Sequence, residues 1–268
     1  TKKNESLATV GTFAIANRYD GIDPDLLAEL NDQMDDLDDD NSILCRTIKV
    51  PAGGTLAFEV QTGDEPDDLE YMKEINGVIV FTHRLNARWA FAYGEGDDDT
   101  KAPDCSSMDG KTGINSTTGE VISCDTCPYN EYGSGINKDG TASRGKACKN
   151  MRRIYLMRDG DPNFYLLTIP PTSIRDVNKQ LKRIIAGGTP YTGIVVAFTL
   201  SKEKNRDGIE FSKVAVAKKE LLSKESAIAA LQLRTEIKQQ YKAISVTYGD
   251  YAQVSEETST ATPGEFTE

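Results

Sequence analysis

The first forty residues combine a weakly apolar arm with one amphipathic segment. Its apolar side chains recur at three- to four-residue spacing directly after the sequence Asp-Pro-Asp: Leu26, Leu27, Leu30, Met34 and Leu37. This spacing after a start signal predicts a helix. The aspartate-rich run over 35–40 is too repulsive for a core, so we expect a solvated helix end or linker there.

From residue 43 the pattern changes to short apolar runs of strand length. The predicted strands lie at 43–50, 55–60, 77–83, 88–93, 154–158, 164–169, 191–201 and 209–217. Glycine, proline and aspartate cluster between them and predict turns. Asp159-Gly160 is a strong two-residue turn signal, so the runs on either side of it are expected to form a hairpin.

Two longer segments have helical periodicity. The first has Thr172 or Ser173 as its cap and ends at Gly187. The second is expected over about 219–243. The end of the chain, 247–268, is acidic and rich in Ser and Thr, a composition typical of disorder.

The order of these elements indicates a mainly β chain with helices, of the α+β class. Short strands with one loop insertion and a helix between late strands fit a small closed or partly open barrel. We expect an OB-like barrel, and a generic α+β sheet fits the pattern nearly as well. The expected parts are an N-terminal arm and acidic helix (1–42), an OB-like β core (43–218) with an insertion at about 100–152, a C-terminal helix (219–246) and an acidic disordered tail (247–268).

The net charge of −11 is unevenly distributed along the chain. It is −14 over 1–100, +7 over 101–219 and −4 over 220–268. An acidic total ordinarily argues against a nucleic-acid partner. The basic middle weakens that objection, because phosphate binding depends on a local patch and not on the net charge.

Four of the five cysteines lie in the insertion. Cys105, Cys124, Cys127 and Cys148 have the spacing C-x18-C-x2-C-x20-C, and the central pair forms a knuckle whose sulfurs reach one tetrahedral ion. The sequence between them is dense in Gly, Asn, Ser, Thr and Asp and has too few apolar side chains to fold without a metal. We therefore predict one structural Zn2+ site, in which four thiolates leave no open position for catalysis.

Other roles of the cysteines stay open. A disulfide needs an oxidising compartment, and the chain carries no sign of export. A redox Cys-x-x-Cys sits at a strand-to-helix junction, whereas Pro128-Tyr129 leads into more loop. An iron–sulfur cluster is a further alternative. Cys45, on the first predicted strand, fits a small buried hydrophobe better than a fifth ligand.

Basic residues gather around the last cysteine. They are Arg144, Lys146, Lys149, Arg152 and Arg153. A metal would hold this cationic segment rigid, which lowers the entropy cost of binding phosphate groups. A second basic stripe, at helical spacing, is expected to be a solvated helix face: Arg175, Lys179, Lys182 and Arg183.

Aromatic residues lie on the predicted strands beside the basic segment. Trp89, Phe91 and Tyr93 alternate on one strand and share a face, and Tyr155 lies on another. Rings on a β surface beside cations are what single-stranded nucleic-acid binding uses. Alternating strand aromatics are also typical of a core, so both roles stay open for Trp89, Tyr93 and Tyr155.

Signatures of an enzyme are absent from the sequence. His83 is the single histidine, so a histidine metal triad or deaminase centre cannot be built. Neither a phosphate loop nor a dinucleotide fingerprint occurs. We therefore expect the protein not to be an enzyme.

Four segments, 105–111, 124–130, 145–153 and 167–173, carry a resemblance. Through them the chain resembles a family of uncharacterised phage and mobile-element proteins with a four-cysteine zinc insertion, over roughly 40–220. In plan it also resembles the single-stranded-DNA-binding proteins of tailed phages, which place a zinc insertion in an OB barrel or end in an acidic tail with an aromatic residue. Phe266 fits such a tail, whereas the cysteine spacing and the missing histidine ligand differ from the best-known example.

The leading hypothesis is a single-stranded DNA-binding protein of phage or mobile-element replication or recombination. The acidic tail is the expected contact for replication or recombination proteins. The alternative is a phage-encoded protein-interaction module that inhibits or redirects a host protein. No stretch approaches the roughly 20 apolar residues that cross a bilayer and no secretory signal is present, so the cytoplasm of a bacterial host is the expected location. DNA, RNA and protein partners are not distinguished by the sequence.

Overall fold

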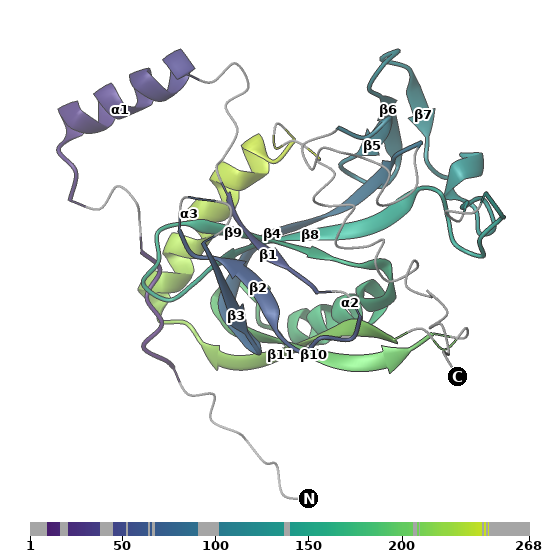
Figure 1. Ribbon diagram of the computed structural model, residues 1–268. Coiled ribbons are helices and arrows are strands. Elements are labelled where there is room, and N and C mark those ends of the chain that lie inside the picture. The colour runs from purple at the N-terminus through teal and green to yellow at the C-terminus, as the bar shows by residue number, and fades with distance from the viewer. Residues whose placement is uncertain are drawn as a thin grey trace, which may run out of the picture.

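The computed structural model describes residues 10–16, 21–37, 45–51, 53–63, 65, 68–90, 102–136, 140–205, 208, 210–242, 244 and 246. Within these residues, eleven strands form one sheet and three α-helices accompany it (Figure 1). The α+β class predicted from the sequence is confirmed. None of the described helices is both long and apolar enough to cross a bilayer.

The elements follow one another along the chain with these bounds. The strands are β1 (Cys45–Lys49), β2 (Phe58–Gln61), β3 (Leu69–Met72), β4 (Glu74–Arg88), β5 (Cys105–Ser107), β6 (Thr112–Asn115), β7 (Val121–Ser123), β8 (Lys149–Met157), β9 (Phe164–Ile169), β10 (Ile194–Lys204) and β11 (Glu210–Leu221). The helices are α1 (Pro24–Leu37), α2 (Pro171–Ala186) and α3 (Lys224–Gln240), with the 3-10 turns η1 (Pro128–Asn130) and η2 (Tyr191–Gly193).

Strand β4 is the strand that connects all parts of the sheet. The order is β3-β2-β1-β9-β8-β4-β5-β6-β7, with β10 and β11 attached to β4. One edge of β4 pairs with β8. Residues 86 and 87 pair with β8 and with β5 at once, so β5 lies on the opposite edge, and residues 74–77 pair with β10. The body of the protein and the cysteine-bearing segment are therefore two ends of one sheet.

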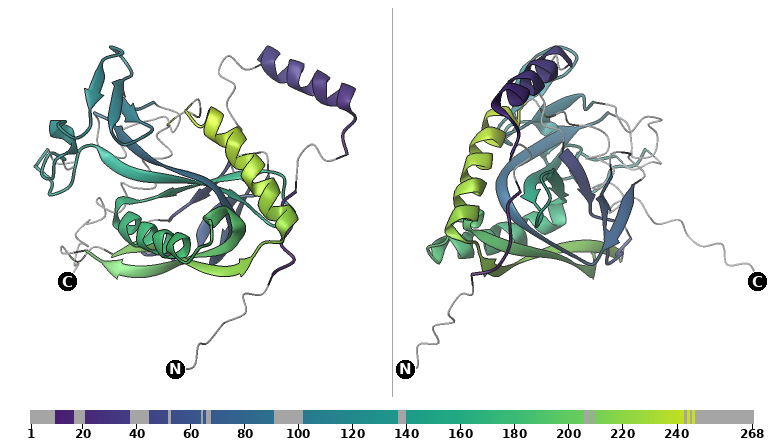
Figure 2. Two further views of the ribbon diagram at one scale, coloured as in Figure 1. Left: turned by 180° about the vertical axis from the view of Figure 1, so that it is seen from behind. Right: turned by 90° about the vertical axis from the view of Figure 1, so that its left-hand side faces the viewer.

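The expected small barrel is not closed. Each of the outermost strands β3, β7 and β11 pairs with a single neighbour in the described part of the chain. The sheet instead curls, as the side view of Figure 2 shows, with α3 along one side of the molecule. The predicted closed barrel is therefore wrong, because within the described residues the ladder of strands ends at β3, β7 and β11 and does not return on itself.

The two long helices bury opposite faces of the sheet. Alternate residues of β8 face opposite ways, and Ile154 and Leu156 join one apolar cluster while Tyr155 and Met157 join the other. Helix α2 closes the first cluster with Val177, Leu181 and Ile184. Helix α3 closes the second with Ala230 and Ile237. We call these the α2 face and the α3 face.

Most predicted elements are confirmed, with shifted ends. The Asp159-Gly160 turn joins β8 to β9 in an antiparallel hairpin, with Gly160 at φ 66°. Strand β4 contains the predicted strand 77–83 but only the first residue of the predicted strand 88–93. Residues 89 and 90 lie beyond its end, and 91–93 lie outside the described residues. The short strand β3 occupies a segment without a predicted strand. It is stabilised by pairing with β2 rather than by its own pattern.

Helix α3 begins later than the sequence predicts. Residues 219–221 continue β11, because their pairing with β10 extends to Ile194↔Leu221. Ser223 then caps α3 by accepting from the Ser226 N–H at 3.1 Å. Helix α1 is present as predicted and lies apart from the sheet in Figure 1. The predicted tail, 247–268, lies outside the described residues.

Candidate metal centre and nucleic-acid interface

Residues 102–148, here called the cysteine lobe, extend the sheet beyond the end of β4. Cys105 of β5 pairs with Arg88 of β4, and β6 and β7 continue the ladder. After β7 the chain makes the η1 turn and returns to the sheet as β8. The lobe projects at the far end of β4 and β8 from α3 (Figure 1).

Backbone hydrogen bonds draw the cysteines together. The Cys124 N–H donates to the Lys111 carbonyl at 2.8 Å, which holds the knuckle against the β5–β6 turn. The Asn130 side-chain amide donates to the Cys124 carbonyl at 2.7 Å and closes the knuckle from the other side. The Cys148 N–H donates to the Tyr129 carbonyl at 2.8 Å. The last cysteine is thereby bonded to Tyr129, which follows the central pair by two residues in the sequence.

The four thiols lie close enough together to affect the pKa of one another. Gly113 lies between two of them: a Cβ there would be 3.0 Å from the Cys105 Sγ and 3.7 Å from the Cys124 Sγ. Burial, followed by the thiols of Cys124, Cys105 and Cys127, raises the pKa of Cys148 to about 12. Within the described residues, however, no three Cys, His, Asp or Glu side chains stand in the arrangement of a bound metal. The structure therefore gathers the predicted ligands without forming the coordination sphere.

The lobe has almost no apolar core of its own. In its described part, the buried residues with an apolar side chain are Pro103 and Cys124. Ile114, Val121 and Ile136 are 54%, 67% and 70% exposed. Turns and short ladders of this kind do not bury enough surface to hold a fold by the hydrophobic effect alone.

The basic segment around the last cysteine is divided by strand alternation. Arg152 and Arg153 are consecutive in β8 and therefore face opposite sides of the sheet. Arg153 is 1% exposed on the α3 face and donates to the Ile244 carbonyl at 3.2 Å. The expectation that Arg153 contacts phosphate is therefore wrong in this fold. Lys149 is partly buried, and that burial lowers the pKa of its ammonium group.

The remaining basic residues of the segment are exposed or partly buried. Arg144 is exposed. Lys146 donates to the Asn130 side-chain oxygen at 3.1 Å, and its Nζ lies 5.0 Å from the centre of the Tyr132 ring. Arg152 is half-buried on the α2 face, where its Nη1 donates to the Thr82 hydroxyl at 3.1 Å. Phosphate contacts by these three side chains stay a prediction.

Two of the three strand aromatics belong to the core. Tyr155 is 0% and Trp89 is 5% exposed, so neither offers a ring face to a base. Tyr93 lies outside the described residues. The structure thus selects the core role that the alternating pattern had left open for Trp89 and Tyr155, because β4 and β8 are covered on the α3 face.

Sequence reasoning missed the aromatic residues that are exposed. Tyr132 is 84% and Tyr129 is 44% exposed, both in the cysteine lobe. The Arg88 guanidinium lies 3.8 Å from the centre of the Tyr129 ring, in cation–π geometry. Because a segment without an apolar core cannot bury its rings, the polar composition of the insertion was the signal that could have found them.

His83 is buried in a cluster of rings. It is 7% exposed, and its ring centroid is 5.8 Å from that of Tyr155 and 4.7 Å from that of Tyr241. Its Nδ1 lies 2.7 Å from the Arg84 carbonyl and 3.0 Å from the Met108 carbonyl. Both partners are acceptors, so Nδ1 carries the proton and Nε2 accepts from the Tyr155 hydroxyl at 3.3 Å. Burial is the main cause that lowers the pKa of His83 to about 4.

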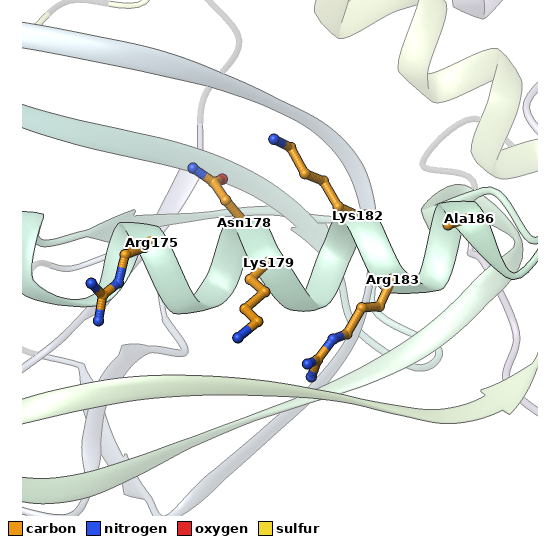
Figure 3. A pocket seen from close by; sticks show the side chains of 6 residues that line it. All are labelled: Arg175, Asn178, Lys179, Lys182, Arg183 and Ala186. Carbon is orange, nitrogen blue, oxygen red and sulfur yellow. The ribbon is translucent and has the colours of Figure 1, made fainter.

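A second cationic surface lies on the solvent side of α2. A shallow concavity of about 570 Å³ is lined by Arg175, Asn178, Lys179, Lys182, Arg183 and Ala186 (Figure 3). In Figure 3, Lys179 and Arg183 extend from one side of the helix and Lys182 from the other. Among the described residues, no aromatic side chain lines the concavity. The predicted solvated basic stripe is thus present as a shallow surface.

Comparisons of the chain with protein-family models, with curated proteins and with solved structures find no match.

Proposed function

We propose that the protein binds single-stranded DNA during replication or recombination of a phage or mobile element. A Zn2+ ion held by Cys105, Cys124, Cys127 and Cys148 would stabilise the lobe that carries the interface. The observation that carries the proposal is the pair of exposed rings on this lobe, each beside a cation. Base stacking on exposed rings, with cations beside them for the backbone, binds strands without reading their sequence.

The zinc part of the proposal is supported by how little else holds the lobe. Its described residues bury two apolar side chains, those of Pro103 and Cys124, and one of them is a predicted metal ligand. Hydrogen bonds from the Asn130 side chain to the Cys124 carbonyl and from the Cys148 N–H to the Tyr129 carbonyl already tie both cysteines to the η1 turn. Four thiolates form a closed tetrahedral site with Zn–S bonds of about 2.3 Å.

The stacking part rests on Tyr132. One side of its ring faces the Lys146 ammonium, and most of the side chain is open to solvent. One face of the Tyr129 ring is covered by the Arg88 guanidinium, so Tyr129 exposes less of its side chain than Tyr132 does. Asp125 and Glu131 are exposed in the same lobe and offset part of its positive charge. The lobe would therefore contribute binding energy mainly through its exposed rings and not through its net charge.

Binding of a fluorescent oligo-dT at several salt concentrations tests this function. We expect wild-type affinity to fall with salt, with a slope of about −0.7 per phosphate contacted. Tyr132→Ala should cost about 1–3 kcal/mol of binding free energy, the usual value for one stacked base. The matched control is Tyr71→Ala, because Tyr71 is 68% exposed on β3 in the body. Absence of oligo-dT binding by the wild type at low salt would remove the proposal.

Several predictions from the sequence are not tested by the structure. An acidic tail that recruits replication or recombination proteins falls on 247–268. An OB-like relationship of the curled sheet, a location in the cytoplasm of a bacterial host and the absence of enzymatic activity also stay predictions.

One observation favours the alternative of a protein-interaction module. Ile114, Val121 and Ile136 expose apolar surface on the same lobe. Exposed apolar side chains on a small rigid unit suit a protein partner better than a nucleic acid. Salt-insensitive capture of a host protein, lost in Val121→Ser and retained in Tyr132→Ala, would favour this second function.

A further inference from the structure

Two arginines lie directly opposite each other on the α2 face, where the body meets the cysteine lobe. Arg84 of β4 is the register partner of Arg152 of β8. Opposite residues of an antiparallel pair point to the same side of the sheet. Thr82 precedes Arg84 by two positions and shares that side, and its hydroxyl accepts from the Arg152 Nη1 at 3.1 Å.

Within the described residues, no acidic side chain neutralises this pair of positive charges. No carboxylate in the described part of the chain forms a hydrogen bond or ion pair with either guanidinium. Burial and then the nearby charge of Arg84 lower the pKa of Arg152. Like charges directly opposite each other destabilise a sheet. A bound anion would remove that cost.

Arg152 also has an unused donor. Its Nε is buried and is the one buried side-chain nitrogen or oxygen without a hydrogen-bond partner in the described residues. The Thr82 hydroxyl bonds Nη1 and not Nε, and it donates its proton to the Arg153 carbonyl at 2.8 Å. A buried donor without a partner is rare and calls for an acceptor.

Arg84 gives solvent access to the pair and is held in place by the lobe. Its side chain is exposed. Gly110, at φ 71° in the β5–β6 turn, lies against the aliphatic part of Arg84, and a Cβ there would be 3.0 Å from the Arg84 Cδ. Glycine permits this close approach, so the lobe positions the Arg84 guanidinium beside Arg152.

We infer that Arg84 and Arg152 together bind one phosphate group, and that this group is a phosphodiester of the strand whose bases stack on the lobe. Guanidinium groups present planar, paired donors that match phosphate oxygens. Arg88 lies on the same side of β4 as Arg84 and stacks on Tyr129. The pair therefore continues the surface of the lobe onto the body. The choice of a nucleic-acid phosphate rests on the proposed function, whereas the anion site itself does not.

Two measurements on the full-length, zinc-loaded protein test the inference. Binding of inorganic phosphate is followed by 31P NMR at constant ionic strength. Binding of an oligo-dT of about 20 nucleotides is followed by fluorescence anisotropy. The variants are Arg84→Gln, Arg84→Lys, which keeps the charge but loses the fork, and Lys218→Gln as a control that removes one exposed charge from β11.

We expect Arg84→Gln to weaken oligo-dT binding about tenfold and to reduce the salt slope by about 0.7, the value for one phosphate of a single strand. Arg84→Lys should fall between this variant and the wild type, and Lys218→Gln should stay within about twofold. Saturable phosphate binding by the wild type should be lost in Arg84→Gln.

The two proposals fail in different ways. If the wild type binds phosphate through Arg84 but no oligo-dT, the anion site stands and the single-stranded DNA function is removed. If the wild type binds oligo-dT and Arg84→Gln equals it in both measurements, the function stands and this inference is overturned. Equal losses in Arg84→Gln and Lys218→Gln would also overturn it, because a general charge effect would then explain the result.

Discussion

The body and the cysteine lobe share strand β4 but are stabilised in different ways. In the body, β4 is covered on both faces, and residues such as Val78 and Ile79 are 0% exposed. In the lobe, the strands that continue the sheet bury almost nothing apolar, and Ile114 and Val121 face solvent. A continuous ladder of backbone hydrogen bonds therefore does not imply a continuous core.

This difference explains the division of roles that we propose. Apolar burial scales with area and stabilises the body without any ligand. The lobe keeps its rings and cations at the surface because no core draws them inside. A metal would supply the rigidity that burial does not. A surface that must remain polar and exposed is thus separated from the part of the protein that provides the fold.

Removal of the metal should produce the largest difference between the two regions. Structural zinc contributes about 10–16 kcal/mol to the folding of small domains. We expect a strong chelator, or Cys127→Ser, to abolish hydrogen-exchange protection of the Cys124 and Cys148 amides while β10 and β11 remain protected. Hydrogen exchange with mass spectrometry measures both regions in one experiment.

The matched control is Cys45→Ser. Cys45 lies in β1 and is partly buried against the α3-face cluster, so its substitution should leave lobe protection and zinc content unchanged. About one zinc per chain is expected in the wild type, in protein never exposed to chelators. Full protection of the lobe amides in metal-free protein would contradict the zinc site.

Truncation of a side chain should destabilise the protein much more in the core of the body than in the lobe. Phe198 is 0% exposed in the α2-face cluster, so Phe198→Ala should lower the free energy of unfolding by about 3–5 kcal/mol. Ile136→Ala in the lobe should change it by less than about 0.5 kcal/mol, because Ile136 is 70% exposed. Urea unfolding followed by tryptophan fluorescence measures the free energy of unfolding of both variants. Similar losses in the two variants would show that the lobe has an apolar core.

Acid should weaken the junction between the two regions through His83. The pKa of His83 is lowered to about 4 in the fold, below the ordinary value of 6.5. The unfolded chain therefore binds the proton more readily, and stability from the neutral ring is complete above about pH 6.5 and is lost as the pH falls toward 4. The loss reaches about 3 kcal/mol.

Urea unfolding at pH 7 and pH 5 measures this dependence. His83→Gln should flatten it, because the neutral amide keeps one donor and one acceptor without titrating. Carboxylates that titrate in the same range affect both proteins and cancel in the difference. An equal pH dependence in wild type and variant would contradict a buried neutral His83.

The smallest effect is expected on the basic surface of α2. Lys179→Glu with Arg183→Glu should weaken oligo-dT binding less than about threefold at physiological salt, because these exposed charges lie on the body and are screened over about 8 Å. Tyr132→Ala provides the reference within the lobe. A larger loss from the α2 variant than from Tyr132→Ala would move the interface from the lobe to the body.

The local elements were largely predictable from the sequence. Helical spacing found α1 and α2, and the Asp159-Gly160 signal found the β8–β9 hairpin. The start of α3 was misplaced because residues 219–221 are held in β11 by pairing, which a local pattern does not contain. Strand β3 was missed for the same reason.

The candidate site was predictable only in its chemistry. Cysteine spacing predicts four candidate ligands, but the positions of the basic and aromatic residues depend on which face of the sheet is covered. Arg152 and Arg153 are neighbours in sequence, yet one is half-buried on the α2 face and the other is fully buried on the α3 face. The partner of Arg152 is Arg84, which is distant in the chain and was not considered.

By itself, the sequence determined the α+β class, the positions of the four cysteines and the polar composition of the insertion, because these depend on local periodicity and residue type. The tertiary structure alone decided that Trp89 and Tyr155 are core, that Tyr129 and Tyr132 are exposed, and that Arg84 lies opposite Arg152. Burial and cross-strand register are set by contacts between residues far apart in the chain, and no local pattern records them.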